Sequence, residues 1–210
     1  LAITNNATTA GGNLTLTTDE ALALAVTSVT GDMSLTSNGA ITDSGTITVS
    51  GTTTFASGAA NNITFDTVSN NFGTVIISNG NNVVLEDTNA IILGASSVSG
   101  TLGVTAGGTI SDSGNVAVAG NVTLTTDANN GVINMGTLQQ STGDLILVTN
   151  GNGAATVVNN AGIDFGTSNV GGALSATASS GNITQNGGAL TVAGTSSFIL
   201  GANSANVVLD

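Results

Sequence analysis

Positively charged side chains are missing from this chain, which has no lysine, arginine or histidine. Its twelve aspartates and glutamates are therefore unopposed, and the formal net charge is −12. Nucleic acid is disfavoured as a partner because phosphate binding depends on cationic side chains, and an anionic membrane surface is excluded for the same reason. Since no ion pair can form between side chains, the fold must rest on burial and hydrogen bonding.

Cysteine and proline are also absent, and aromatic residues make up only 2% of the chain. Without cysteine there is neither a disulfide nor a thiolate metal site. The apolar content of 40% must therefore fill a narrow interior with valine, leucine, isoleucine and alanine. No apolar run approaches the roughly 20 residues of a transmembrane helix, so no membrane insertion is expected. With no proline and no charge block to mark a boundary, residues 1–210 are expected to form one continuous domain.

What the chain does have is a short motif, Gly-x-φ-x-φ, in which φ is usually apolar. A spacing of 19 to 29 residues between its copies is typical of a solenoid, and the strict alternation indicates β-strands rather than helices. The nine copies begin at Gly12, Gly31, Gly51, Gly73, Gly100, Gly120, Gly143, Gly172 and Gly194. The residues predicted to point inward are Leu14, Leu16, Met33, Leu35, Val75, Ile77, Leu102, Val104, Val122, Leu124, Leu145 and Leu147.

A longer period lies over the short one. The segment Ile41–Gly45 reads Ile-Thr-Asp-Ser-Gly. It recurs as Ile-Ser-Asp-Ser-Gly at 110–114 and, further altered, as Ile-Thr-Gln-Asn-Gly at 183–187. The connector at 67–73 likewise recurs at 137–143. These matches divide the chain into three units of roughly 70 residues, at 1–66, 67–136 and 137–210, with three rungs each.

Short strands in stacked rungs of about 20 residues predict an all-β fold, a parallel β-helix or β-solenoid. Parallel crossovers are overwhelmingly right-handed, so the right-handed form is expected. About nine rungs at about 4.8 Å each would give a rod about 43 Å long.

The two ends of the chain agree in phase. The last five residues, 206–210, match 62–66, and the first six resemble the segment that follows Asp66. We therefore expect either a segment of a longer fibre or a subunit that self-associates head to tail. The residues expected to carry the end-stacking contact are Leu1, Ile3, Leu14, Leu16, Phe198, Val207 and Leu209.

Three strings resemble a known group of proteins. Residues 12–18, 106–111 and 120–126 are similar to the repeats of filamentous-haemagglutinin-type adhesins and related autotransporter passengers. The resemblance covers essentially the whole chain, and it implies a secreted right-handed β-helix that projects from a bacterial surface as a stalk or fibre. It therefore implies an extracellular structural module. The complete lack of lysine and arginine departs from many members of that group.

Calcium or glycan binding at the surface is the alternative function. Asp43 and Asp112 occupy matching Asp-Ser-Gly segments, and carboxylates are hard ligands that suit calcium. The third copy has Gln185 instead, although a required calcium site should keep its carboxylate. Turn formation is thus the simpler interpretation of these residues, and no cofactor is otherwise expected.

An enzyme and an ice-binding protein are less favoured. The only adjacent acidic pairs are Asp19-Glu20 and Glu86-Asp87, and neighbours on a strand point to opposite faces. We expect the acidic groups to be solvated and name no catalytic residue. Ice binding requires a regular outward array of threonine, which the motif interrupts at Ile76, Gly103 and Ile146.

Overall fold

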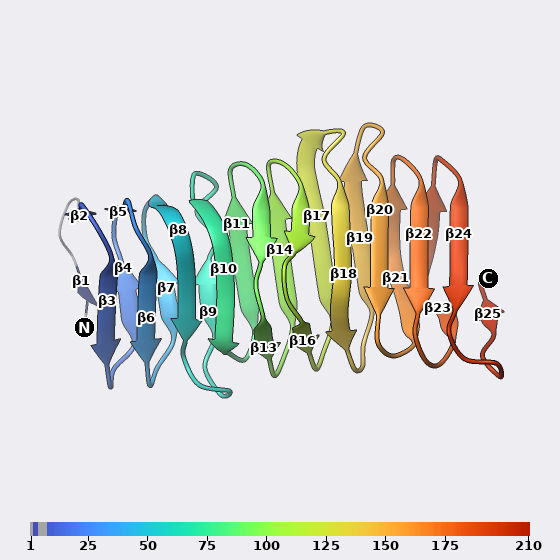
Figure 1. Cartoon of the computed structure of the whole chain (residues 1–210), viewed down its shortest axis with the longest axis horizontal. Helices are drawn as coiled ribbons and strands as arrows, with labels where there is room; N and C mark the ends of the chain where they lie inside the picture. Colours follow the sequence, from blue (N-terminus) through green and yellow to red (C-terminus); the bar gives the residue numbers. More distant parts are fainter. Residues whose placement is uncertain (1, 4–7) are drawn as a thin grey trace.

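The chain folds into one elongated stack of coils (Figure 1). The computed structural model describes residues 2–3 and 8–210, with side chains from residue 11 onward. None of the described residues is helical, and every pairing between described strands is parallel. Threonine, valine and isoleucine favour strands, while glycine, asparagine and serine occupy the corners between them.

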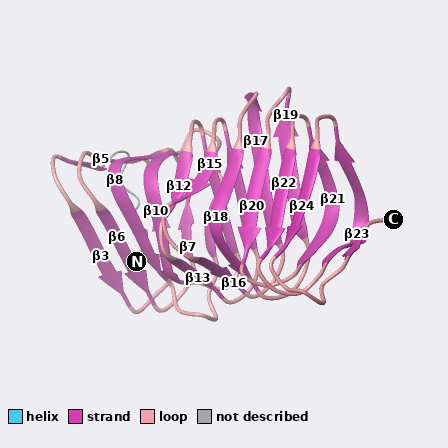
Figure 2. Ribbon diagram, turned by 45° about the vertical axis from the view of Figure 1, so that its right-hand side comes forward, coloured by secondary structure: helices cyan, strands magenta, loops and turns pink. Residues whose placement is uncertain are grey.

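The strands form two sheets, sheet A and sheet B. Sheet A contains, in spatial order, β1 (Ala2–Ile3), β4 (Leu22–Leu24), β7 (Ile41–Asp43), β9 (Ile63–Phe65), β11 (Val83–Asp87), β14 (Leu102–Ala106), β17 (Val122–Asn129), β19 (Leu145–Asn150), β21 (Ile163–Val170), β23 (Ile183–Val192) and β25 (Val207–Val208). Loops connect the strands along the edges of the stack (Figure 2).

Sheet B has ten strands along its main path and four strands beside it. The path is β2 (Thr8–Ala10), β5 (Thr27–Val29), β8 (Ile47–Ala56), β10 (Asn71–Asn79), β12 (Ile91–Leu93), β15 (Ile110–Asp112), β18 (Ile133–Gln140), β20 (Ala155–Asn159), β22 (Leu174–Ala178) and β24 (Ser196–Leu200). Beside it lie β3 (Leu14–Thr18), β6 (Met33–Ser37), β13 (Ser96–Val98) and β16 (Val116–Val118).

The chain alternates between the sheets for about ten turns, one more than the motif count predicts. In Figure 1 strands of sheet B such as β6 and β24 run downward in front, while β17 of sheet A runs upward behind them. Because the chain advances from left to right, the winding is right-handed, as predicted. Paired positions in successive strands of sheet A are 19 to 24 residues apart. At about 4.8 Å per turn, ten turns make a rod about 48 Å long.

The nine glycine motifs are not equivalent in space, and this corrects the simple rung count. The first four precede or enter strands of sheet B, the next three precede strands of sheet A, and the last two precede strands of sheet B. The two longest intervals, Gly73 to Gly100 and Gly143 to Gly172, are where the motif changes sheet. An interval between motif glycines that is longer than one turn therefore indicates that the motif has moved to the other sheet.

The longer repeat also changes sheet from one copy to the next. The register runs from Leu14 through Met33, Thr53 and Val75 to Leu93, one turn at each step. The counterpart of Leu14 in the next unit is Val83. It falls between Val75 and Leu93 in the sequence and lies in sheet A. One sequence unit is therefore between three and four turns long. The strands of sheet B that correspond to β11, β14 and β19 of sheet A are β3, β6 and β10. In the third unit the copies of β11 and β14 are β20 and β22, which lie in sheet B again.

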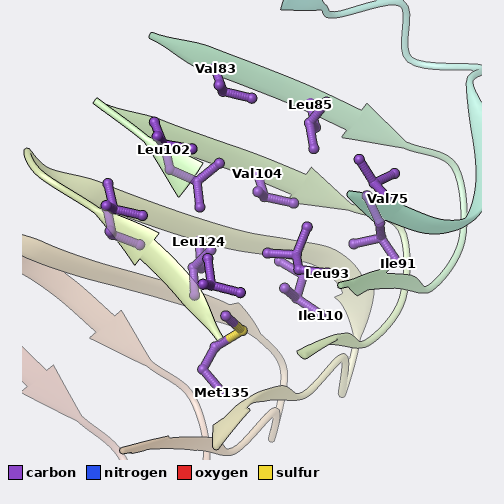
Figure 3. Packing of buried hydrophobic residues seen from close by; sticks show 14 of the residues in the cluster. Val75, Val83, Leu85, Ile91, Leu93, Leu102, Val104, Ile110, Leu124 and Met135 are labelled. Atoms are coloured by element: carbon purple, nitrogen blue, oxygen red, sulfur yellow. The ribbon is translucent and has the colours of Figure 1, made fainter. Parts of the chain in front are cut away.

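A continuous apolar core lies between the sheets. Figure 3 shows Val83 and Leu85 of β11 stacked over Leu102 and Val104 of β14, with residues of sheet B facing them. Ten of the twelve predicted inward residues are buried. Leu14 and Leu16 are only partly buried, because among the described strands β3 pairs with β6 alone. Both nevertheless pack against the core, so the inward direction predicted for them is confirmed.

Candidate functional site

A ladder of side-chain caps runs along the corners of the rod. The residue after the motif glycine is often asparagine or aspartate, and its side-chain oxygen accepts a hydrogen bond from the backbone N–H one turn later. Asn13 Oδ1 accepts from Asp32 N at 2.9 Å, and Asp32 Oδ1 accepts from Thr52 N at 2.8 Å. Asn121, which follows Gly120, does the same at 3.1 Å. Asn182 makes an equivalent contact with Asn206 N at 2.9 Å, although the Gly181 before it is not one of the nine motif glycines. These polar side chains thus replace water at corners where the backbone would lack a partner.

The motif glycine makes room for this cap. A Cβ on Gly31 would collide with Asn13 Oδ1, and a Cβ on Gly143 would collide with Asn121 Oδ1. Gly143 also has a φ of 80°, in the left-handed region that side chains disfavour. The cap therefore needs two residues: an asparagine or aspartate in one turn, and a glycine in the next turn that leaves room for its side chain.

The two calcium candidates, Asp43 and Asp112, lie in different sheets, at the ends of β7 and β15. Asp43 Oδ1 accepts from Asp66 N at 3.3 Å, and its Oδ2 accepts from Asn70 Nδ2 at 2.6 Å. Asp112 accepts from Gly136 N at 2.9 Å and from the Thr137 N–H and hydroxyl at 2.6 and 2.8 Å. The structure does not bring the two carboxylates together.

The third copy of this segment makes a related contact without a carboxylate. Gln185 donates from Nε2 to the Asp210 carbonyl oxygen at 3.2 Å. Asp66, Gly136 and Asp210 occupy corresponding places in the three units. All three side chains therefore reach the same point of the next turn, which favours turn formation over a metal site for these residues.

Buried polar side chains at the connectors were missed by sequence reasoning. Asn70 is fully buried, accepting from Ile47 N at 2.8 Å and donating to Asp43. Gln140 is buried at the corresponding place, and its Nε2 donates to three backbone carbonyls, those of Gly120, Thr142 and Asp144, at 3.0 to 3.2 Å. An amide at the same position of the repeated connector was the available signal.

Asp87 corrects the expectation that every acidic group is solvated. It is 2% exposed, and its two oxygens accept from Phe72 N at 2.6 Å and Asn89 N at 2.8 Å. Burial raises the pKa of Asp87, although these two hydrogen bonds act in the opposite direction. The corresponding residue of the third unit is Asn159, which is also fully buried and hydrogen-bonded to the Gln140 backbone.

Two other carboxylates, those of Glu86 and Asp164, also have shifted pKa values. The pKa of Glu86 is raised, first by desolvation and then by repulsion from Asp127, Asp66 and Asp43. Burial acts to raise the pKa of Asp164, but hydrogen bonds from Asn186 and Thr184 outweigh it and lower the pKa. Glu86 and Asp87 point to opposite faces of β11, as expected for neighbours on a strand.

The predicted end-stacking residues lie in the first and last turns. Leu1 and the Ile3 side chain fall outside what the structure describes, while Leu14, Leu16 and Phe198 are partly buried against the core. At the other end Val207 is 41% exposed and Leu209 is 38% exposed. Leu190, Val192 and Leu200 complete a set of partly covered apolar side chains on the last turns. The stacking itself stays a prediction.

Shallow grooves mark the lateral surface. One of about 460 Å³ lies over β8 and β10, where Gly51 and Gly73 lack side chains and Asn71 and Asn89 contribute polar groups. A second, of about 230 Å³, includes Thr142 and Asp164.

The outward positions of the nine glycine motifs, which an ice-binding array of threonine would need, divide between the two sheets and form no single array. Among the residues described, no group of three or more acidic, histidine or cysteine side chains is placed to hold a metal ion. The same part of the chain contains no helix long and apolar enough to cross a membrane.

Comparison with protein families identifies the repeat. A family model described as repeats of unknown function (DUF5649) matches residues 11–79, 80–145 and 151–210, so the chain belongs to this family. The internal matches within the sequence predicted units that begin at 1, 67 and 137 instead. Both divisions give three units, but they begin at different points of the repeat. No curated protein and no solved structure matches the chain.

Proposed function

We propose that this member of the repeat family is a structural module, a stiff segment of an extracellular fibre or adhesin stalk. The observation that carries the proposal is the unbroken parallel pairing of both sheets from the first described turn to the last. Each turn rests only on its neighbours, which is the property that lets solenoids grow by adding repeats. Function then lies in length and stiffness rather than in a reacting group.

The interior supports a load-bearing role. The buried side chains form one cluster that runs from β4 to β23, with no gap between the three units. The corner caps add side-chain hydrogen bonds between successive turns along the same direction. Stretching the rod along its axis would have to break many of these contacts together, so we expect high resistance to extension.

Length measurement tests the mechanical part of this proposal. Proteins with one, two and three fused copies of the chain would be compared by small-angle X-ray scattering. Each added copy should lengthen the particle by about 48 Å while its cross-section stays constant, given about 4.8 Å per turn. Particles that bend freely between copies, or that widen instead of lengthening, would contradict the rod.

Cell-surface labelling tests the location. Antibodies against the folded chain should bind intact cells of the source, and external protease should remove the signal. Labelling that appears only after the cells are broken open would contradict an extracellular role.

Glycan binding at the lateral surface is the second candidate function. The 460 Å³ groove over β8 and β10 favours it, because amides and hydroxyls such as those of Asn71, Thr74 and Asn89 suit sugar hydroxyl groups. A glycan array is the test, with Asn71→Ala and Asn89→Ala expected to abolish any signal. A signal unaffected by both substitutions would exclude this groove.

A further inference from the structure

The lateral surface carries the same groove twice, once in each of two successive units. The groove over β8 and β10, called the Asn71 groove below, shares lining positions with the 230 Å³ groove that includes Thr142, called the Asp164 groove. The matching positions are 71–73, 90 and 92 in the Asn71 groove and 141–143, 162 and 164 in the Asp164 groove. The groove is therefore encoded in the repeat.

The two copies of the groove lie on different sheets. Residues 71–74 and Ile92 belong to β10 and β12 of sheet B, whereas Asp164 and Thr184 belong to β21 and β23 of sheet A. β21 and β25 pair with β23 on its two sides, so the Asp164 groove lies within the stack of turns (Figure 1). Its volume of 230 Å³ equals about eight water molecules at ~30 Å³ each, which is room for one small polar molecule.

Hydroxyl groups of the Asp164 groove already use their protons within the protein. The Ser141 hydroxyl, at 3.4 Å, and the Thr142 hydroxyl both donate to the Ala119 carbonyl oxygen. The Thr184 hydroxyl donates to Asp164 Oδ1 at 2.8 Å. Each of these three hydroxyl oxygens keeps lone pairs that can accept a hydrogen bond. Toward a ligand they therefore act as acceptors.

The carboxylate of Asp164 adds to these acceptors. Its Oδ1 accepts from Thr184 and Asn186, while among the described residues its Oδ2 accepts from Asn186 Nδ2 alone, at 3.1 Å. A carboxylate has about four lone-pair sites, so Oδ2 can accept from a ligand as well. Burial acts to raise the pKa of Asp164, but its hydrogen bonds lower the pKa overall and keep the group ionised at neutral pH.

The Asn71 groove offers different chemistry. Its counterpart of Asp164 is Ile92, an apolar side chain that is 38% exposed, and none of its lining residues is acidic. The negative charge is thus specific to the Asp164 groove. Because the chain has no lysine, arginine or histidine, none of its own side chains can neutralise this charge. A ligand that does so must have a cationic group.

We propose that the Asp164 groove binds an amine-bearing sugar, with the ammonium group on Asp164 Oδ2 and ring hydroxyls donating to Thr142 and Thr184. An ammonium group has a positive charge and only donors, which suits acceptors gathered around one carboxylate. A lysine side chain of a partner would instead place methylene groups against the hydroxyls and leave them unpaired. The proposal goes beyond the glycan candidate above, which concerns the Asn71 groove, because it assigns a site and a class of sugar to the other copy.

An NMR titration of the isotope-labelled chain is the test, with methyl glucosaminide as the probe. The backbone amide signals of residues 141–143, 163–165 and 182–184 should shift along a saturating curve. The N-acetylated probe has the same ring without the charge and should bind about 10-fold more weakly, the order expected for loss of a charge-assisted hydrogen bond. Butylammonium, which has the charge without the hydroxyls, should also bind more weakly.

Asp164→Asn tests the carboxylate itself, because the amide has nearly the same shape and no charge. It should weaken the binding of methyl glucosaminide about 10-fold and leave the binding of the N-acetylated probe unchanged. Asp127→Asn is the matched control. It removes the same charge from an exposed carboxylate that does not line the groove, and it should bind as the unmodified chain does. Thermal unfolding should confirm that both variants are folded, and the comparison of probes needs no variant.

Three results would overturn the proposal: no shift with methyl glucosaminide, equal binding of the N-acetylated probe, or equal weakening by Asp127→Asn, which would indicate unspecific attraction to the net charge. Butylammonium that binds as tightly as the sugar would assign the groove to lysine side chains and reject the sugar. Asn71→Ala and Asn89→Ala test the Asn71 groove separately, so either groove can fail while the other stands. None of these results bears on the fused-copy lengths that test the rod.

Discussion

Thr53 shows how a single buried atom can be left without a partner. It stands in the inward register between Met33 and Val75 and is fully buried. Its hydroxyl is the one buried side-chain polar atom of the described residues that lacks a hydrogen bond. Burying an unpaired hydroxyl is costly, and the apolar residues at neighbouring places in the register show what the position favours.

Thr53→Val should therefore stabilise the protein. The substitution keeps the shape of the side chain and removes the unpaired hydroxyl, so we expect the free energy of unfolding to rise by about 1–2 kcal/mol. Urea unfolding would measure the change. Thr54→Val, on the outer side of the same strand, is the control and should have little effect.

Acidification should stabilise this protein over a range where many proteins begin to lose stability. Because the folded pKa of Asp87 is raised, its contribution is fully present below the unfolded pKa and is lost as pH rises through the folded value. Glu86 acts in the same direction. We expect the free energy of unfolding to increase as pH falls from 7 toward about 4, the ordinary range of carboxyl titration.

Two substitutions separate the contributions to this slope. Asp87→Asn should flatten the rise, because the buried group no longer titrates. Asp164→Asn should steepen it, because the lowered pKa of Asp164 gives stability that is lost as pH falls through that pKa. Urea unfolding at a series of pH values measures both, and identical slopes in the two variants would refute the assignment.

At the scale of the strand and its corner, the cap between turns makes glycine indispensable at a capped corner but not within a strand. Gly143 combines a φ of 80° with the Asn121 side chain in the place of a Cβ, whereas a Cβ on Gly103 would meet one atom, at 3.9 Å. Gly143→Ala should lower the free energy of unfolding by about 1–3 kcal/mol, the usual cost of a strained backbone position.

Gly103→Ala is the control, at a glycine away from the corner. It lies within β14 with open space beside it, so we expect no loss and a gain of up to about 1 kcal/mol from reduced chain entropy in the unfolded state. Thermal unfolding of both variants measures the contrast. Equal losses would show that the cap is not what requires glycine at residue 143.

The strands were predictable from sequence, but their assignment to sheets was not. Alternation placed Met33, Leu102 and Leu145 correctly inside, because burial of one face is written directly into a period of two. The same pattern fits either sheet equally well, since both bury one face against the same core. Only the long intervals after Gly73 and Gly143 indicated that the motif moves between sheets.

The polar interior was beyond reach of the alternation pattern. Asn70 and Asp87 are buried because backbone N–H groups distant in sequence need acceptors there. The two contacts join residues 23 and 15 positions apart. Hydropathy places such residues at the surface. The calcium candidates Asp43 and Asp112 were found as a repeated segment, yet the repeat separated them onto different sheets.

At the scale of the whole molecule, a net charge of −12 with no cation makes stability sensitive to dissolved ions. Calcium and magnesium at equal concentration should raise the melting temperature by similar amounts, because screening depends on ionic charge rather than on ion size. Differential scanning calorimetry is the measurement. A calcium-specific rise that Asp43→Asn or Asp112→Asn removes would instead establish a binding site.

A repeat that spans a fractional number of coils also has an evolutionary consequence. When a unit of such a gene is duplicated, the new copy faces a different direction from its parent, as Asp43 and Asp112 already do. A surface residue acquired once and then copied would be displayed around the rod instead of along one side. Antibodies or receptors that recognise it could then approach from several directions, and no single flank of the rod would be free of the epitope.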